Sequence, residues 1–327
     1  MHVVKMRVAL IGPEGAGKST IFYLLTGVKP DYYVKEVRPG VMKVQDDRLD
    51  RLTQLIKPDK VVHATIEFYD IPEERWHMAQ DADVIAITIP YFRDKKPREY
   101  YDDVRTTMVV RDLEIIEHAL MRLYKEHKRR DEQVIQVLEK LKGWLETSTY
   151  VGDKLSEDER HRISGYSLLS IKPSVVLANM REVDEFDKSI WEDTGEVVVP
   201  TRAKLETEIM EMEEDERDEF LSLLKEGPTA GRMVAAVYRV TDTITFYTIA
   251  HKRIQAWPIR RGVTAIEAAG LIHSDIARGF IKAEVTRYDE FVQVGDWDAL
   301  KKAGKVKLEG KSYQIEDGDI IEFKFHV

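Results

Sequence analysis

Apolar positions along the first part of the chain form short runs without strict alternation. These runs lie at Arg7–Ile11, Ala64–Ile71, Val84–Ile89, Ser174–Asn179 and Val197–Val199. Such runs are typical of strands that are buried on both faces of a mostly parallel sheet. Residues 19–26 instead space their apolar side chains as a helix does. We therefore predict an α/β domain that begins with a strand, a loop and a helix.

The pattern changes to that of long helices between Arg111 and Ser164. Apolar residues recur there every three or four positions, first at Leu113, Ile116, Leu120 and Leu123, and then at Val134, Leu138, Leu141 and Leu145. This spacing gives each helix one apolar face. We predict an antiparallel helical hairpin at residues 111–164, inserted into an α/β domain of residues 1–110 and 165–240.

The last third of the chain predicts a different module. An acidic stretch, Leu205–Lys225, keeps apolar residues at helical spacing and is expected to form one amphipathic helix. After about Val240 the pattern becomes that of strands, with one helix opened by the capping box of Thr264 and Glu267. The strands are expected at Ile244–Ile249, Gln255–Ile259, Ile281–Val285, Val306–Leu308 and Ile320–Phe325. Residues 241–327 should therefore form a small α+β domain.

Composition narrows the class of protein. The 327 residues are 43% hydrophobic and 33% charged, with a net charge of -9, which is typical of a globular protein and does not favour extensive coating of nucleic acid. The chain has no cysteine, which excludes disulfides, thiolate metal sites and cysteine nucleophiles. We find no long apolar segment that would predict a signal peptide or membrane span. The expected location is the cytoplasm.

A phosphate-binding motif stands between the first strand and the first helix. Gly12, Gly17, Lys18 and Ser19 satisfy the P-loop pattern G-x-x-x-x-G-K-[S/T]. In this motif the backbone N–H groups surround phosphate oxygens, the lysine reaches the β and γ phosphates, and the hydroxyl can ligate Mg²⁺. Lys18 is the only residue to which we assign stabilisation of phosphate charge. The predicted phosphate-binding residues are Gly12, Glu14, Gly15, Ala16, Gly17, Lys18, Ser19 and Thr20.

Two further strand ends supply candidate ligands. A P-loop site needs a second carboxylate to hold the metal, and Asp70 ends the Ala64–Ile71 run, so we predict a Mg²⁺ site of Ser19 and Asp70. Asn179, Met180 and Glu182 follow another buried run, where GTPases carry N-K-x-D. Because the aspartate of that signature accepts both N–H donors of guanine, its replacement by Glu182 favours relaxed or adenine specificity. The sequence leaves ATP and GTP both open as ligands.

At these residues the chain resembles the Obg-like ATPases of the YchF family, and the similarity is strongest near the C-terminus. It includes Phe246–Thr248, Ile254–Trp257, Gly279–Val285 and Leu308–Tyr313. The resemblance implies a P-loop NTPase domain with N-x-x-E in place of N-K-x-D, an inserted coiled coil and a C-terminal TGS domain of β-grasp fold. It also implies a nucleotide switch that prefers ATP and is linked to ribosomes, translation or stress control.

One segment departs from this family. The family's Asp-x-x-Gly becomes Asp70, Ile71, Pro72 and Glu73, and the next strand follows almost at once at Val84. The glycine that senses the γ-phosphate and the segment that carries the water-positioning residue are therefore both missing. Because such groups contribute on the order of 10³–10⁵ in rate, we expect nucleotide binding with very slow hydrolysis unless a partner completes the site.

The expected tip of the hairpin is basic. Its cations, set against Glu126, are Arg122, Lys125, Lys128, Arg129 and Arg130. A charged helix end is commonly just a solvated surface, but this one could also contact an RNA or ribosomal phosphate backbone, together with the TGS domain. An alternative hypothesis is a non-catalytic adaptor for RNA or protein with a vestigial nucleotide site. A small-molecule phosphotransferase is disfavoured because its acceptor pocket is not recognisable. The sequence does not indicate an oligomeric state.

Overall fold

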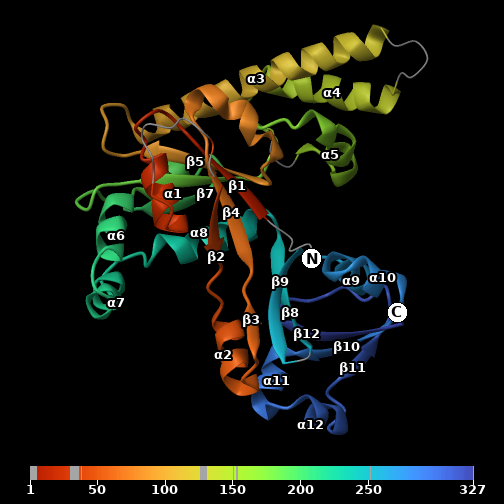
Figure 1. Ribbon diagram of the computed structural model, residues 1–327. Coiled ribbons are helices and arrows are strands. Elements are labelled where there is room, and N and C mark those ends of the chain that lie inside the picture. The colour runs from red at the N-terminus through yellow and green to blue at the C-terminus, as the bar shows by residue number, and fades with distance from the viewer. Residues whose placement is uncertain are drawn as a thin grey trace. The chain divides into compact units, whose positions relative to one another are not determined.

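The computed structural model describes residues 6–29, 37, 39–125, 131–149, 151, 154–250 and 252–326 (Figure 1). The chain forms two compact units. We call one the P-loop unit, which comprises Arg7–Gly40 and Phe68–Met233, and the other the C-terminal unit, which contains Val41–Glu67 and Val234–Val327. The expected domain of residues 1–110 includes residues 41–67, and the structure places these residues in the C-terminal unit. No helix among the described residues combines the length and apolar character needed to cross a membrane.

The sheet of the P-loop unit has the strand order β2-β4-β1-β5-β6-β7. Its strands are β1 (Met6–Ile11), β2 (Pro39–Lys43), β4 (Thr65–Asp70), β5 (Val84–Pro90), β6 (Ser174–Asn179) and β7 (Val197–Thr201). Strand β5 pairs in parallel with both β1 and β6, and β6 pairs in parallel with β7. All residues of β5 and β6 are buried, which confirms the prediction of a mostly parallel sheet covered on both faces.

The P-loop unit also contains helices and 3₁₀ turns. They are α1 (Lys18–Thr26), η1 (Glu73–Asp81), α3 (Pro97–Lys125), α4 (Glu132–Leu145), α5 (Glu157–Ile163), η3 (Ser164–Tyr166), η4 (Lys188–Trp191), α6 (Ala203–Met210) and α7 (Glu214–Ser222). Helix α8 (Thr229–Val240) spans the point at which the chain enters the C-terminal unit. The prediction of one continuous helix over Leu205–Lys225 is wrong, because α6 ends at Met210 and α7 begins at Glu214. Ile209 is buried whereas Phe220 is 43% exposed, so the two segments share no single buried face.

Helices α3 and α4 form the predicted antiparallel hairpin, and α3 begins at Pro97 rather than near Arg111. Its core includes Ile116, Leu120, Leu138 and Leu141, which lie on the apolar faces that the spacing predicted. Arg122 and Lys125 belong to the last turn of α3. The other predicted tip residues, Lys128, Arg129 and Arg130, lie outside the described part of the chain.

The C-terminal unit contains a mixed sheet with the order β11-β10-β12-β8-β9-β3. Its strands are β3 (Lys60–Val62), β8 (Thr243–Ala250), β9 (Arg253–Arg260), β10 (Phe280–Arg287), β11 (Lys307–Glu309) and β12 (Asp319–Phe325). Its helices are α2 (Asp47–Ile56), α9 (Ala265–Ile272), α10 (Ser274–Arg278), α11 (Tyr288–Val294) and α12 (Trp297–Lys302). Helix α9 begins at the predicted capping box and packs into one core with β8, β9, β10 and β12, as expected for a β-grasp fold.

Helix α2 is fixed to this sheet by polar contacts. Arg48 forms a two-pronged ion pair with Asp317, with N–O distances of 2.8 and 3.2 Å. The Tyr247 hydroxyl donates to Asp46 at 2.6 Å, and Asp46 also caps α2 by accepting from the N–H groups of Arg48 and Leu49. Strand β3 adds to the edge of the sheet by parallel pairing with β9. These contacts explain why residues 41–67 belong to the C-terminal unit.

Candidate functional site

The loop between β1 and α1 has the backbone geometry of a phosphate cradle. Gly12, Gly15 and Gly17 have φ angles of 144°, 70° and 91°, in the region that favours glycine. A Cβ atom on Gly12 would lie 2.4 Å from the backbone oxygen of Thr88 in β5. The loop can therefore approach the neighbouring strand this closely only because residue 12 has no side chain.

Two polar side chains from distant segments line the same loop. A Cβ atom on Gly15 would lie 1.9 Å from Nη2 of Arg93, and one on Gly17 would lie 2.1 Å from Nδ2 of Asn179. Arg93 follows β5 in the chain, and Asn179 is the last residue of β6. The ends of two adjacent parallel strands thus bring an exposed guanidinium and a buried carboxamide to the loop.

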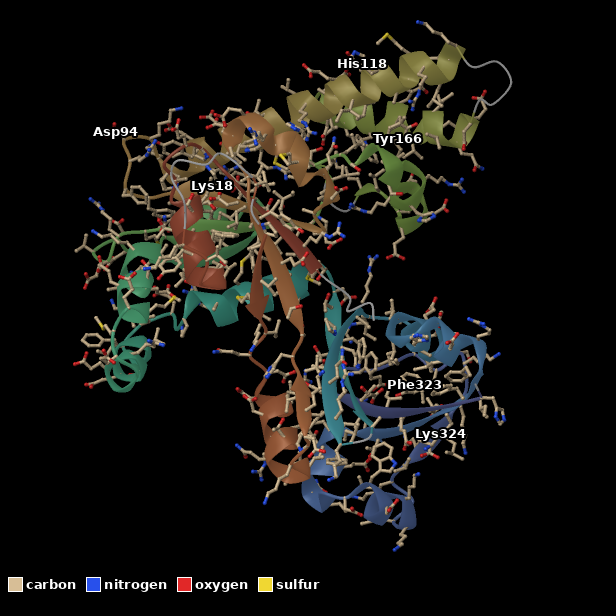
Figure 2. All side chains as sticks on the ribbon, in the orientation of Figure 1. Lys18, Asp94, His118, Tyr166, Phe323 and Lys324 are labelled. Carbon is tan, nitrogen blue, oxygen red and sulfur yellow. The ribbon has the colours of Figure 1, made fainter. Side chains whose placement is uncertain are left out.

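Lys18 is buried at the start of α1, where Figure 2 labels it. Its ammonium donates hydrogen bonds of 2.9 Å to the carbonyl oxygens of Gly12 and Pro13. Burial lowers the pKa of Lys18 from the ordinary lysine value, because desolvation penalises the charged form; nearby carboxylates, led by Asp70 and Glu73, act in the opposite direction. The loop therefore surrounds the ammonium group of Lys18, which supplies the positive charge that phosphate recognition requires.

Ser19 and Asp70 meet as predicted for a metal pair. The Ser19 hydroxyl donates to Oδ2 of Asp70 at 2.6 Å, which joins the start of α1 to the end of β4. A hydroxyl and a carboxylate are oxygen ligands of the kind that Mg²⁺ prefers. No group of three or more His, Cys, Asp or Glu residues that could hold a metal is present in the described ranges. A P-loop site does not need one, because phosphate oxygens and water complete the coordination of Mg²⁺.

Asn179 joins the predicted base-recognition segment to the loop. Its Nδ2 donates to the Ala16 carbonyl at 2.9 Å, and its Oδ1 accepts from the Ala203 N–H at 3.4 Å. Met180 is buried and continues the pairing with β7 through its N–H and the Thr201 carbonyl. Glu182 is exposed in the turn that follows. The structure therefore brings Asn179 against the loop, while Glu182 faces solvent beyond the end of β6.

Sequence reasoning missed two contacts at this site. The N–H of Glu14, inside the loop, donates to Oε2 of Glu73 at 3.0 Å. The substitution of the family's glycine by Glu73 was visible, but the direction of its side chain was not. Arg93 gave no sequence signal, since it lies in the charged stretch Arg93–Lys96 and matches no motif.

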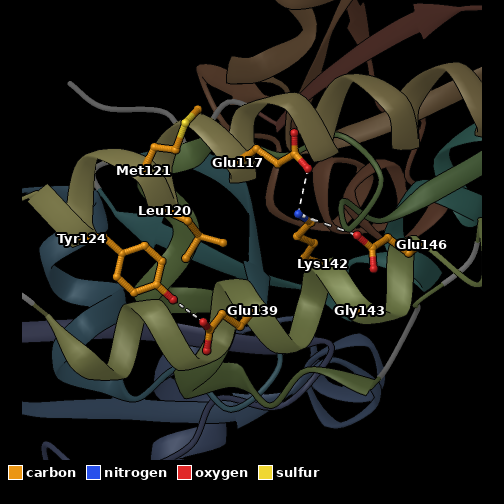
Figure 3. A pocket seen from close by; sticks show the side chains of 8 residues that line it. All are labelled: Glu117, Leu120, Met121, Tyr124, Glu139, Lys142, Gly143 and Glu146. Atoms are coloured by element: carbon orange, nitrogen blue, oxygen red, sulfur yellow. Dashed lines mark hydrogen bonds and ion pairs between the residues drawn. The ribbon is translucent and has the colours of Figure 1, made fainter.

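A separate shallow groove of about 570 Å³ lies along the helical hairpin (Figure 3). Its polar side chains pair with one another. Lys142 contacts Glu117 at 2.7 Å and Glu146 at 3.7 Å, and the Tyr124 hydroxyl donates to Glu139. These pairs account for the charges that line the groove, and we assign no ligand to it.

Residues 243–326 match the family model YchF-GTPase_C, described as a protein of unknown function (DUF933). The "Ribosome-binding ATPase YchF" of Haemophilus ducreyi (strain 35000HP / ATCC 700724) is 33% identical over 358 aligned positions, covering 97% of this chain and 98% of the relative. The chain belongs to the YchF family. The YchF protein of the same description from Bacillus subtilis (strain 168) is 30% identical over 361 positions, with the same shares covered.

Solved structures show the same fold. The Schizosaccharomyces pombe YchF GTPase aligns with a TM-score of 0.82 at 23% identity, covering 98% of this chain and 97% of that one. A GTP-binding protein from Pyrococcus horikoshii OT3 aligns with a TM-score of 0.66 at 14% identity, covering 98% and 100%. These alignments confirm the expected combination of a P-loop unit with a C-terminal β-grasp unit in a YchF protein.

Proposed function

We propose that this YchF protein binds Mg²⁺ and ATP, in preference to GTP, and that the bound nucleotide controls its association with the ribosome in the cytoplasm. One observation carries the proposal. The loop at Gly12–Ser19 contacts a metal-type carboxylate, Asp70, through Ser19 and the strand-end amide of Asn179 through the carbonyl of Ala16. Such a loop is built to take the phosphates of a nucleotide whose metal and base lie at opposite ends.

Each residue has a role that follows from its contacts. The N–H groups of the loop and the first turn of α1 would bind phosphate oxygens, and Lys18 would balance their charge. Ser19 and Asp70 would hold Mg²⁺, which supplies further charge stabilisation when it is bound. Asn179 supports the loop through the Ala16 carbonyl and does not itself read the base. Glu182, from the segment that reads guanine in GTPases, would set the base preference.

We further propose that hydrolysis is very slow in the isolated protein. Only Ile71 and Pro72 separate Asp70 from η1, and β5 begins three residues after η1 ends. This short connection replaces the segment that orients the attacking water in related enzymes. Because such positioning contributes on the order of 10³–10⁵ in rate, turnover should become appreciable only when a partner supplies the missing group.

The proposed partner is the ribosome, which the names of the bacterial relatives give as the partner of those proteins. The contact surface that we propose includes the C-terminal unit and the basic end of α3, where Arg122 and Lys125 lie. Cations at such a surface would pair with RNA phosphates, so the association should weaken as salt concentration rises.

Thermal unfolding with Mg²⁺ and either nucleotide tests the binding site, with Lys18→Ala as the comparison. Ligand at a hundred times its Kd adds about 2.7 kcal/mol, which for domains of this size is a rise of several degrees in Tm. A larger rise with ATP than with GTP, lost in the variant, would support the proposal. No rise with either nucleotide would contradict it and favour the adaptor hypothesis.

Co-sedimentation with ribosomes tests the switch, using ATP, ADP and no nucleotide. Ribosome binding that depends on the nucleotide in the natural protein but not in Lys18→Ala is the expected result. Binding that is identical in all states would remove the regulatory part of the proposal. The base preference is tested by Glu182→Asp, which restores the carboxylate position of N-x-x-D and should shift the ratio of ATP to GTP affinity toward GTP.

A further inference from the structure

Glu73 extends its side chain out of its own element and onto the phosphate loop. It is the first residue of η1 and is exposed, yet its carboxylate accepts the N–H of Glu14, a residue 59 positions earlier. The backbone N–H groups of such a loop are the donors that bind phosphate oxygens. A carboxylate oxygen of Glu73 therefore already accepts the Glu14 N–H, one of the donors with which the loop would bind a phosphate.

The two ends of the site show which phosphate this donor would face. Ser19 and Asp70 mark the metal end, and the metal in P-loop proteins bridges the β and γ phosphates. Asn179, against Ala16, marks the end that leads to the base. Glu73 follows Asp70 by three residues along the chain, so its carboxylate lies at the metal end, beside the position of a γ-phosphate.

We propose that Glu73 is a specificity-determining residue that makes the loop favour a nucleoside diphosphate over a triphosphate. This inference rests on the proposed nucleotide site. A γ-phosphate would bring negative charge next to the carboxylate and would compete for the Glu14 N–H, whereas a diphosphate ends before that point. The carboxylate also lies close enough to Lys18 to act on its charge, so it takes up part of the attraction that a γ-phosphate would otherwise receive.

The presence of Glu73 at the position of the family's glycine would thus change how the loop meets a γ-phosphate. A glycine at this position offers its N–H to the γ-phosphate, while Glu73 places an anion in front of the same phosphate. The diphosphate-bound protein would then keep the hydrogen bond between Glu73 and the Glu14 N–H. Binding of a triphosphate would require the side chain of Glu73 to leave the Glu14 N–H.

Isothermal titration with Mg²⁺·ADP and Mg²⁺·ATP tests this on the full chain and on three variants. Glu73→Gln keeps the size of the side chain and removes its charge, and Glu73→Ala removes the contact. Glu74→Gln is the matched control, because Glu74 also acts on the charge of Lys18 and the substitution removes the same charge at the neighbouring position. Residues 73 and 74 are both exposed, so these substitutions should leave the fold intact, as melting curves would verify.

The natural protein should bind ADP more tightly than ATP. Both Glu73 variants should improve ATP affinity at least about fivefold relative to ADP, the factor for two like unit charges about 4 Å apart even in water. Glu74→Gln should leave the ratio of the two affinities unchanged. An unchanged ratio in the Glu73 variants, or an equal change in Glu74→Gln, would overturn this inference while leaving the nucleotide site in place. Failure of every protein to bind either nucleotide would overturn the proposed function itself.

Discussion

The side-chain amide of Asn179 donates a hydrogen bond of 2.9 Å to the carbonyl of Ala16, and both groups are buried. This contact joins the end of β6 to the middle of the phosphate loop, across 163 residues of sequence. The first residue of the N-x-x-E signature therefore stabilises the shape of the loop, and we propose that base discrimination falls to the later positions of the signature.

Asn179→Ala should weaken ATP and GTP binding by the same factor, because the lost contact lies on the loop and not on the base. It should also lower the free energy of unfolding by about 1–3 kcal/mol, since the Ala16 carbonyl and Ala203 N–H lose their partner in a buried place. Urea unfolding and nucleotide titration measure the two effects. Asn179→Asp is the control that keeps the acceptor for Ala203 but not the donor to Ala16. Unequal losses for ATP and GTP would show that Asn179 also reads the base.

Alanine at Gly12 should be far more damaging than alanine at Gly15. At Gly12 the new Cβ meets the backbone oxygen of Thr88 at 2.4 Å, and a strand inside a sheet cannot move away. At Gly15 it meets only the end of the exposed Arg93 side chain, which can turn aside. We expect a cost of about 1–2 kcal/mol at Gly15, from the left-handed backbone, and about 3 kcal/mol or more at Gly12.

Thermal unfolding of both glycine variants measures this difference. The double variant of Gly15→Ala with Arg93→Ala removes the side chain that the new Cβ meets. Because Arg93 can already turn aside in Gly15→Ala, the two variants should differ in stability only by what the Arg93 side chain itself contributes. Similar losses for the two single variants would contradict the geometry of the loop.

Asp112→Ala should loosen the base of the helical hairpin. The Asp112 carboxylate is fully buried and accepts the backbone N–H groups of Leu169 at 3.0 Å and Ser170 at 2.6 Å. Burial raises the pKa of this carboxyl, while the two N–H donors act in the opposite direction. Removing the acceptor leaves two donors unpaired, which should cost about 2–4 kcal/mol. Val110→Ala, at a half-exposed position of the same helix, should change stability by less than about 0.5 kcal/mol.

The packing of α5 against α4 should weaken in acid. Glu159 accepts from Lys140 at 2.7 Å and from the Ser156 N–H at 2.8 Å, and these hydrogen bonds lower the pKa of Glu159 from 4.5 to about 2. A depressed carboxyl pKa means that the stabilisation is complete above the unfolded value, near 4.5, and is lost as pH falls toward 2. An NMR titration of the carboxyl carbon of Glu159 measures this directly. A midpoint near the ordinary glutamate value would contradict the contact, and Glu159→Gln should remove the pH dependence.

Local patterns were sufficient to predict much of this protein. The strand, glycine loop and helix at Arg7–Thr26 follow one another along the chain, so their geometry depends on neighbouring residues. Asp70 could be paired with Ser19 because a P-loop site needs a second carboxylate at the end of a neighbouring buried strand, and the two side chains lie 2.6 Å apart in the structure. The hairpin and the capping box at Thr264 were also predicted from local patterns, because both depend on the spacing of residues within one or two helices.

The sequence by itself determined that this chain carries a P-loop and belongs with the YchF proteins, because each of the motifs that show this is a short run of neighbouring residues. The tertiary structure alone decided where Glu73 and Arg93 point, that Asn179 supports the loop, and that Arg48 pairs with Asp317, 269 residues later. None of these partners shares a local period or a common motif. Each contact depends on which surfaces pack together, and only the folded chain brings those surfaces within hydrogen-bonding distance.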